Sequence, residues 1–185
     1  MNTYVALLRG INVGTKNRIK MVDLKQFFES LGYIDVKTYI QSGNVIFKAD
    51  EDNEEVIINK IEATFEERFQ FSSNIILRTG KELTDIIRNC PFLENEIAEA
   101  KATAEGECFY VSLMKYVPSE DKIKLIDKYE DDANKYKIIG RDVFLLFSKS
   151  IRNSKLANNL GKLDVPSTVR NWNTINKLVS MLDEK

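Results

Sequence analysis

The sequence contains no histidine, and among its 185 residues it has only two cysteines, three prolines and one tryptophan. Without histidine the protein has no Ser-His-Asp or Cys-His nucleophile pair, no imidazole proton shuttle and no histidine-containing zinc site. Two cysteines, Cys90 and Cys108, cannot form a structural metal cluster alone. We therefore predict no catalytic residues, no metal site and no cofactor.

The chain also lacks the long apolar segments that membrane insertion and export require. No run approaches the 18 or more apolar residues of a membrane span. The apolar start, residues 4–8, is too short for a signal sequence and has no basic segment before it. We expect a cytoplasmic protein with reduced thiols and no membrane partner.

The chain as a whole has no excess of positive charge, but both of its ends do. Lys and Arg number 27 against 28 Asp and Glu, a net charge of −1, which excludes a uniformly basic nucleic-acid binder. Residues 1–49 and residues 143–185 each carry seven basic and three acidic side chains, whereas residues 50–132 carry ten basic and twenty-one acidic ones. If the two ends meet in space they form a positive face; otherwise they are unevenly charged solvated surfaces.

The first eighty residues alternate patterns that are typical of strands and helices. Apolar runs that end at glycine or turn residues predict strands, and apolar residues at i, i+3, i+4 and i+7 predict helices. Asp52 and Glu55 form a possible capping box. The predicted elements are a strand over 3–10, a helix over 24–31, strands over 36–40 and 45–47, a helix over 55–69 and a strand over 74–78. This β-α-β-β-α-β order is that of a ferredoxin-like plait.

The rest of the chain repeats much of this order. Thr79 and Glu82 form a capping signal for a short helix that ends before Pro91. Residues 94–107 are expected to form a loop with helical tendency. Further predicted elements are strands over 109–114, 137–139 and 143–147, a helix after Ser119, a helix over 156–163, and a last helix introduced by Pro166 and Ser167. We predict an α+β protein with two plait domains in tandem, residues 1–80 and 81–185.

The segment from Arg9 to Arg18 lies between the first strand and the first helix and contains two glycines and several basic groups. Such a loop presents backbone N–H groups to an anion, or is merely a tight connection. It is no Walker A loop, because there the lysine follows the second glycine directly, whereas here Thr15 stands between Gly14 and Lys16. No acidic residue occurs before Asp23, which favours the anion hypothesis.

Two further segments offer polar groups at the ends of predicted elements. The turn at Gln41–Asn44 suits a hairpin, since glycine and asparagine adopt positive φ cheaply, and its amides also offer donors and acceptors to a ligand. Ser167 as N-cap, with Arg170 nearby, makes an anion site at the start of the last helix, or simply a capped amphipathic helix. Three asparagines in that helix, at 171, 173 and 176, cost helix propensity and hint at a role.

These segments together resemble the signature of a bacterial family that is described only as a domain of unknown function, with the motifs ALLRGINVGG and YIQSGNVVF. The match spans residues 5–14, 39–45 and 168–174, with one departure at Thr15, where the family usually has a second glycine. The resemblance implies two ferredoxin-like plaits and brings no established activity. The motif residues that transfer are Arg9, Gly10, Asn12, Gly14, Gln41, Ser42, Gly43, Asn44, Arg170, Asn171, Trp172, Asn173 and Thr174.

Three functions remain open for these motifs. The leading hypothesis is a binding module for an anionic ligand, either a nucleotide-like small molecule or a short nucleic acid. Its ligand-binding residues would be Arg9, Asn12, Gly14, Gln41, Ser42, Asn44, Arg170, Asn171 and Asn173. The alternatives are a transferase-like enzyme for a phosphorylated substrate, with Arg9 and Arg170 as anion clamp, and a structural or self-associating protein whose motifs lock the two domains together. We expect the Arg9–Arg18 loop and the Gln41–Asn44 turn to lie at the same end of the first sheet.

Overall fold

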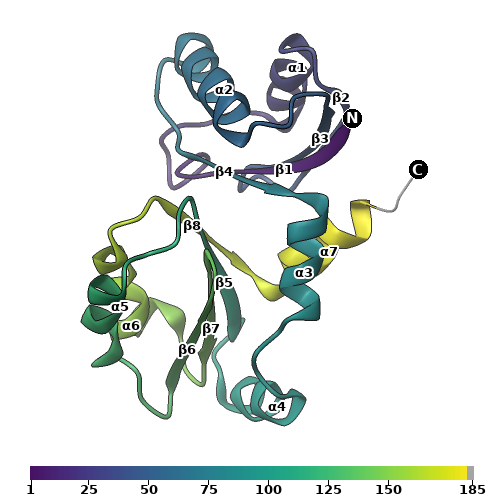
Figure 1. The fold of residues 1–185 in the computed structure, drawn as a ribbon. Helices are drawn as coiled ribbons and strands as arrows, with labels where there is room; N and C mark the ends of the chain where they lie inside the picture. The colour runs from purple at the N-terminus through teal and green to yellow at the C-terminus, as the bar shows by residue number, and fades with distance from the viewer. Residues whose placement is uncertain (183–185) are drawn as a thin grey trace. The chain divides into compact units, whose positions relative to one another are not determined.

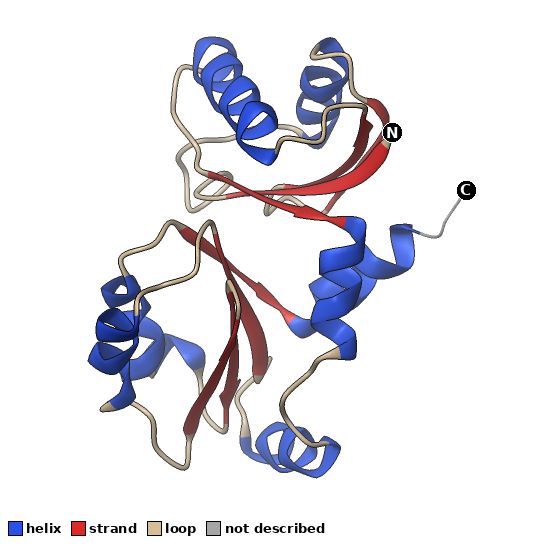
Figure 2. Cartoon of the chain, in the orientation of Figure 1, coloured by secondary structure: helices blue, strands red, loops and turns tan. Residues whose placement is uncertain are grey.

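The computed structural model describes residues 1–182, which form two four-stranded antiparallel sheets and their helices (Figures 1 and 2). The chain divides into two compact units: Met1–Asp85 together with the segment from Asn176 onwards, and Ile86–Ile175. The boundaries between the units fall inside two helices, α3 (Gly80–Arg88) and α7 (Trp172–Leu182). The domain boundary after residue 80, which the element count suggested, stays a prediction.

The first unit has the element order and strand order of a ferredoxin-like plait, as the sequence predicted. Its sheet order is β2-β3-β1-β4, with every neighbouring pair antiparallel. Helices α1 and α2 cover one face of this sheet (Figure 1). The elements are β1 (Asn2–Leu8), α1 (Met21–Ser30), β2 (Ile34–Tyr39), β3 (Asn44–Ala49), α2 (Glu54–Phe69) and β4 (Ile75–Thr79).

The core of the first unit forms between this sheet and its two helices. Alternate residues of β1 face the helices, so Tyr4, Ala6 and Leu8 are buried among aromatic side chains such as Phe28 and Phe65. Ring pairs with centroids 4.5–6.1 Å apart connect α1, α2, β1, β3 and the segments that follow the two helices. This packing holds the strand ends, and therefore the loops that follow them, in fixed positions.

The second unit repeats the topology with the strand order β6-β7-β5-β8, again antiparallel throughout. Helices α5 and α6 lie on one face of this sheet (Figure 1). Two short 3-10 segments, at 151–153 and 160–163, flank α6. The elements are α4 (Glu94–Thr103), β5 (Phe109–Met114), α5 (Glu120–Asp127), β6 (Asn134–Ile139), β7 (Asp142–Phe147), α6 (Lys155–Asn159) and β8 (Ser167–Asn171). The protein is thus an α+β protein with two plaits in tandem.

Three local predictions were wrong. Residues 94–103 form helix α4, not a loop, in keeping with their alanine and glutamate content. The cap of α2 is Asn53 rather than Asp52; its side chain accepts hydrogen bonds from two backbone N–H groups, those of Glu55 and Val56. The third correction concerns the last helix, which does not begin at Ser167: residues 167–171 form strand β8.

Strand β8 exists because it pairs along its whole length with β5, from Ser167 opposite Met114 to Asn171 opposite Tyr110. Five residues of ladder hydrogen bonds with a central strand outweigh the local capping signal that predicted a helix. The true start of α7 is capped by Asn171, whose Oδ1 accepts the N–H of Thr174 at 2.8 Å. The anion site expected at a helix N-terminus near Ser167 is therefore wrong.

Candidate anion site at one end of the first sheet

The connection between β1 and α1 has a backbone that suits an anion. In residues 10–14 the left-handed conformation recurs at every second residue: Gly10 has φ +76°, Asn12 +53° and Gly14 +59°, whereas the residues between them do not have positive φ. Where left-handed residues alternate with right-handed ones, successive N–H groups turn toward one concavity that binds anions. Among residues 1–182 no acceptor takes the N–H groups of Gly10, Ile11, Val13 or Gly14.

Asn12 holds this loop in place. Its Nδ2 donates to the carbonyl oxygens of Ile19, at 3.0 Å, and Gln41, at 2.8 Å, while its Oδ1 accepts the N–H of Ile19 at 2.8 Å. Its own N–H donates to the carbonyl of Asn17 at 2.9 Å. The Asn12 amide is thus engaged within the chain and positions the loop, and a contact of Asn12 with a ligand stays a prediction.

The hairpin between β2 and β3 lies against the loop. The N–H of Leu8 donates to the carbonyl of Gly43 at 2.8 Å, and the hydrogen bond from Asn12 to Gln41 joins the two segments a second time. A Cβ added to Gly43 would lie 2.6 Å from Ile11 Cδ1, so only glycine fits beneath the loop. The expectation that loop and turn share one end of the sheet is confirmed, because β1 and β2 run parallel with β3 between them.

The polar residues of the turn differ in what they offer. Asn44 is fully buried; its Nδ2 donates to the carbonyl of Tyr39 at 2.9 Å and to Ser42 Oγ at 3.0 Å. Gln41 has an exposed side chain. Asn44 and Ser42 therefore shape the turn, and Gln41 is the amide at this end that faces solvent.

Four exposed cationic side chains belong to the same connection: Arg9, Lys16, Arg18 and Lys20. The backbone of Arg9 is held by Asn74, whose carbonyl accepts its N–H at 3.1 Å, and by Ser73, whose hydroxyl donates to its carbonyl at 2.8 Å. With Asp23 as the first acidic residue of the chain, the loop carries positive charge beside free N–H groups.

Sequence patterns did not single out two apolar residues at this end. Val13 is 68% exposed and Ile40 is 46% exposed. Ile40 also has φ +49°, a conformation that costs an L-residue about 1–2 kcal/mol and that is unusual for a β-branched side chain. No composition or periodicity signal marks such a residue, because the strain arises only when the hairpin closes.

The three predicted site residues of the C-terminal segment lie in the second unit, at the junction of β8 and α7. Arg170 is only 7% exposed; its Nη1 donates to Thr168 Oγ1 at 2.7 Å and to the carbonyl of Val169 at 3.0 Å. Burial lowers the pKa of the Arg170 guanidinium to about 10. Asn171 caps α7, and Asn173 donates to Glu107 Oε1 at 2.7 Å. The ligand-binding roles predicted for Arg170, Asn171 and Asn173 stay predictions.

The two units correspond closely at the ends of their sheets. In the first, the N–H groups of Leu8 and Arg9 donate to the carbonyls of Gly43 and Asn74; in the second, those of Met114 and Lys115 donate to the carbonyls of Arg141 and Pro166. The register also matches: Val5 lies opposite Arg78, as Val111 lies opposite Arg170. The pairs Arg9/Lys115, Gly43/Arg141, Arg78/Arg170 and Thr79/Asn171 are therefore structural counterparts.

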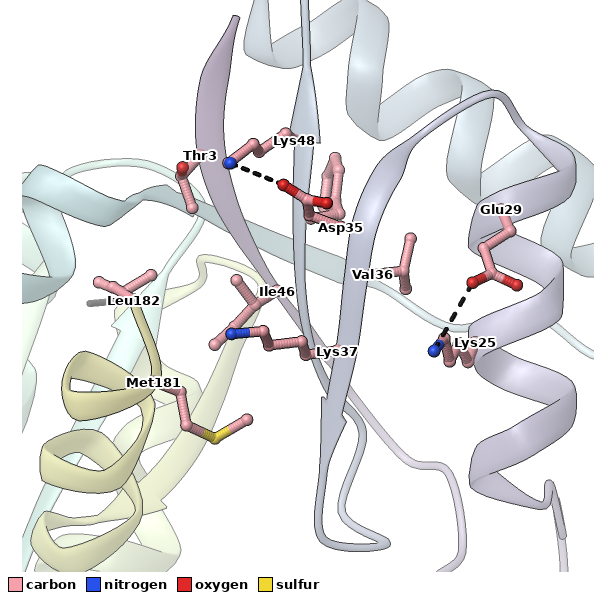
Figure 3. A pocket seen from close by; sticks show the side chains of 11 residues that line it. Thr3, Lys25, Glu29, Asp35, Val36, Lys37, Ile46, Lys48, Met181 and Leu182 are labelled. Atoms are coloured by element: carbon pink, nitrogen blue, oxygen red, sulfur yellow. Dashed lines mark hydrogen bonds and ion pairs between the residues drawn. The ribbon is translucent and has the colours of Figure 1, made fainter. Parts of the chain in front are cut away.

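A separate cavity of about 540 Å³ lies in the first unit beside the edge strand β2 (Figure 3). Its charged side chains are largely occupied with one another: Lys48 contacts Asp35 at 2.6 Å and Lys25 contacts Glu29 at 3.7 Å. The hydrogen bond from Lys48 holds the pKa of Asp35 below its usual range. This mutual pairing leaves the cavity without the concentrated positive charge of the β1–α1 loop.

Comparison with known proteins places the chain in a family. The family model "Protein of unknown function (DUF1697)" matches residues 1–144. The chain belongs to the DUF1697 family. This DUF1697 protein is also similar in structure to "conserved bacterial protein SP0830 from Streptococcus pneumoniae", with a TM-score of 0.75 and 25% sequence identity over 98% of this chain and 99% of that one. No curated protein matches it significantly. Among the helices of residues 1–182, none is long and apolar enough to cross a membrane.

Proposed function

We propose that this DUF1697 protein is a binding module for a phosphate-bearing anion, which the β1–α1 loop holds. The observation that carries the proposal is the alternation of positive φ at Gly10, Asn12 and Gly14, which leaves neighbouring N–H groups without an intramolecular acceptor. Backbone N–H groups arranged in this way bind anions in phosphate loops. The exposed side chains of Arg9 and Arg18 supply charge and the directional donors that phosphate oxygens accept.

The second unit supports a ligand role for the loop rather than a folding role. There the same topology is closed by five residues, 115–119, between β5 and α5, whereas the β1–α1 connection has twelve, residues 9–20. The hairpins at the same ends differ likewise: residues 40–43 against residues 140–141. The longer loop and the longer turn of the first unit lie at the end of the sheet that carries the cationic side chains. Connections that are longer than a fold needs commonly carry function.

The side chains of Asn12, Ser42 and Asn44 enter this proposal as positioning residues, since each is hydrogen-bonded to the chain's own groups. The transferase-like and self-association alternatives, and the cytoplasmic location, stay predictions. No contact of the described residues favours the enzyme over the binding module. The ligand is expected to be a small anion or a nucleic acid segment, and binding is expected to weaken with salt.

The test uses the full chain and inorganic pyrophosphate as the probe, with binding measured by calorimetry and by thermal shift. Wild type should bind, with an affinity that falls between 50 and 500 mM salt, and ligand should raise the melting temperature. The Arg9→Ala and Arg18→Ala variants should each bind roughly tenfold or more weakly, the cost of losing a charged hydrogen bond.

The matched control is Arg68→Ala, which removes an exposed arginine from the C-terminal turn of α2 in the same unit. It should leave pyrophosphate affinity unchanged. Equal losses in all three variants would show diffuse attraction to a positive protein, and no binding by wild type would overturn the proposal.

A further inference from the structure

We infer that the anion belongs to a nucleoside phosphate, whose sugar or base lies against the exposed side chains of Val13 and Ile40. This inference rests on the proposed anion site and specifies its ligand class. It starts from the hydrogen bond between Asn12 Nδ2 and the carbonyl of Gln41, which fixes the loop and the hairpin side by side. Val13 and Ile40 are the chain neighbours of the two residues that this bond joins, so both residues lie beside the junction of the loop and the hairpin.

Ile40 carries the argument because its residue type fits neither its backbone nor its surroundings. At φ +49° an asparagine or a glycine would be unstrained, and a β-branched residue is the least suitable choice. Burial does not explain the choice, since 46% of the residue remains exposed. Strained residues cluster at ligand-binding sites, so a strained residue with a half-exposed apolar side chain beside the anion loop points to a ligand contact.

Val13 adds a second apolar contact within the anion loop itself. It lies between Asn12 and Gly14, and is 68% exposed, so the same turn that offers N–H groups also offers an isopropyl group. Free inorganic phosphate has no apolar surface that could contact these side chains. A ligand that joins a phosphate to an apolar ring would use both, in the way that binding sites generally combine apolar walls with a few placed polar groups.

Gln41 favours a nucleoside over other phosphorylated apolar groups. Its exposed side-chain amide offers a donor and an acceptor side by side, the pattern that the edges of nucleobases complement. A phospholipid would satisfy the phosphate site and the apolar contacts but would leave this amide unused. The shared chemistry is a nucleoside phosphate, present both in free nucleotides and at the ends or along the backbone of a short single strand.

The experiment compares pyrophosphate with ADP on wild type, Ile40→Asn and Ile34→Asn. Ile34 is the matched control because it is also 46% exposed but lies at the start of β2, whereas Ile40 directly follows the end of that strand. We expect ADP to bind wild type more tightly than pyrophosphate does. Ile40→Asn should weaken ADP binding about 5- to 30-fold, from the lost apolar area, and leave pyrophosphate binding unchanged. Its melting temperature should be no lower than that of wild type, because Asn relieves the strain.

The two proposals fail in different ways. If wild type binds neither probe, the anion site itself is overturned. If pyrophosphate binds but ADP binds no more tightly, or if Ile40→Asn and Ile34→Asn weaken ADP binding alike, the anion site stands and the nucleoside inference fails. A lower melting temperature for Ile40→Asn with unchanged ADP affinity would also overturn it, showing that Ile40 serves packing.

Further ligands identify the source of the nucleoside phosphate. Binding of an eight-nucleotide single strand that Ile40→Asn weakens would identify nucleic acid as the source, and preference for ADP would identify a free nucleotide. Binding of anionic phospholipid vesicles that Gln41→Ala leaves unchanged, with no discrimination between ADP and pyrophosphate, would contradict the inference.

Discussion

The two plaits of this chain share the hydrogen bonds at the end of their first strand, but the connections around these bonds differ in length. Both sheets have the same strand order. At the end of its first strand each has the same backbone hydrogen bond, from Leu8 N–H to the carbonyl of Gly43 in one unit and from Met114 N–H to the carbonyl of Arg141 in the other. Around these shared bonds the first unit has a twelve-residue connection and a four-residue turn, and the second has five residues and two. The difference separates what the plait needs from what the first unit adds to it.

The longer loop and turn of the first unit carry positive charge, contain several residues with positive φ, and are held together by a hydrogen bond and by packing. Asn12 joins the loop to the hairpin, and Gly43 leaves room for Ile11, which is buried below the loop. In the second unit the counterpart of the loop includes Tyr116 and Val117, which are exposed, and a proline. The proline-containing connection of the second unit is short, whereas the long cationic loop of the first unit is the segment that we propose binds a ligand.

Exchanging the residues at the shared hydrogen bond should have the largest effect. Gly43→Arg, which gives the first hairpin the residue of the second, forces a side chain into Ile11 and a left-handed conformation, at φ +81°. Strain and overpacking together should lower the free energy of unfolding by about 2–5 kcal/mol. The reverse change, Arg141→Gly, should cost about 1 kcal/mol or less. Urea titrations measure both, and equal costs would show that the long loop does not restrict Gly43.

Arg170 comes next, because the sequence predicts it as an anion ligand whereas the structure buries it. The 7% exposure and the hydrogen bonds to Thr168 and Val169 indicate that Arg170→Ala should lower the free energy of unfolding by about 1.5–3 kcal/mol. Its counterpart Arg78 is fully buried and donates to the carbonyl of Leu77 at 2.9 Å, so Arg78→Ala should cost at least as much. Unchanged stability of Arg170→Ala together with lost pyrophosphate binding would restore the original role of Arg170 as an anion ligand.

The smallest expected effect concerns the helix caps that follow the two counterpart strands. Thr79 and Glu82 cap α3: the N–H of Thr79 donates to Glu82 Oε2 at 2.8 Å, and the N–H of Glu82 donates to Thr79 Oγ1 at 3.2 Å. Asn171 caps α7. Thr79→Ala and Asn171→Ala should each cost about 1 kcal/mol of stability, and neither should change pyrophosphate affinity. Calorimetric unfolding and binding, measured on the same samples, test this. Weaker binding by Asn171→Ala alone would return Asn171 to the ligand site.

Local patterns predicted most of the fold correctly because they report backbone preference and one-sided burial. Periodicity located the strands and helices of the first plait, and the Thr79–Glu82 signal marked the start of α3. The same kind of reasoning failed at residues 167–171, where the partner strand β5 lies more than fifty residues away. No local signal at Ser167 reveals that partner, so the local pattern predicts the helix cap at Ser167 instead of Asn171 and places Arg170 in a helix instead of a strand.

By itself the sequence determined the class of the protein, the tandem plaits, the absence of histidine chemistry and the basic loop near Arg9. These follow from composition, spacing and charge, which no folding step alters. Only the tertiary structure decided which polar residues are engaged: it uses the amides of Asn12 and Asn44 inside the fold, buries Arg170, and strains Ile40 at a half-exposed position. The physical reason is that hydrogen-bond partners, burial and positive φ depend on segments that the chain brings together only when its strands pair.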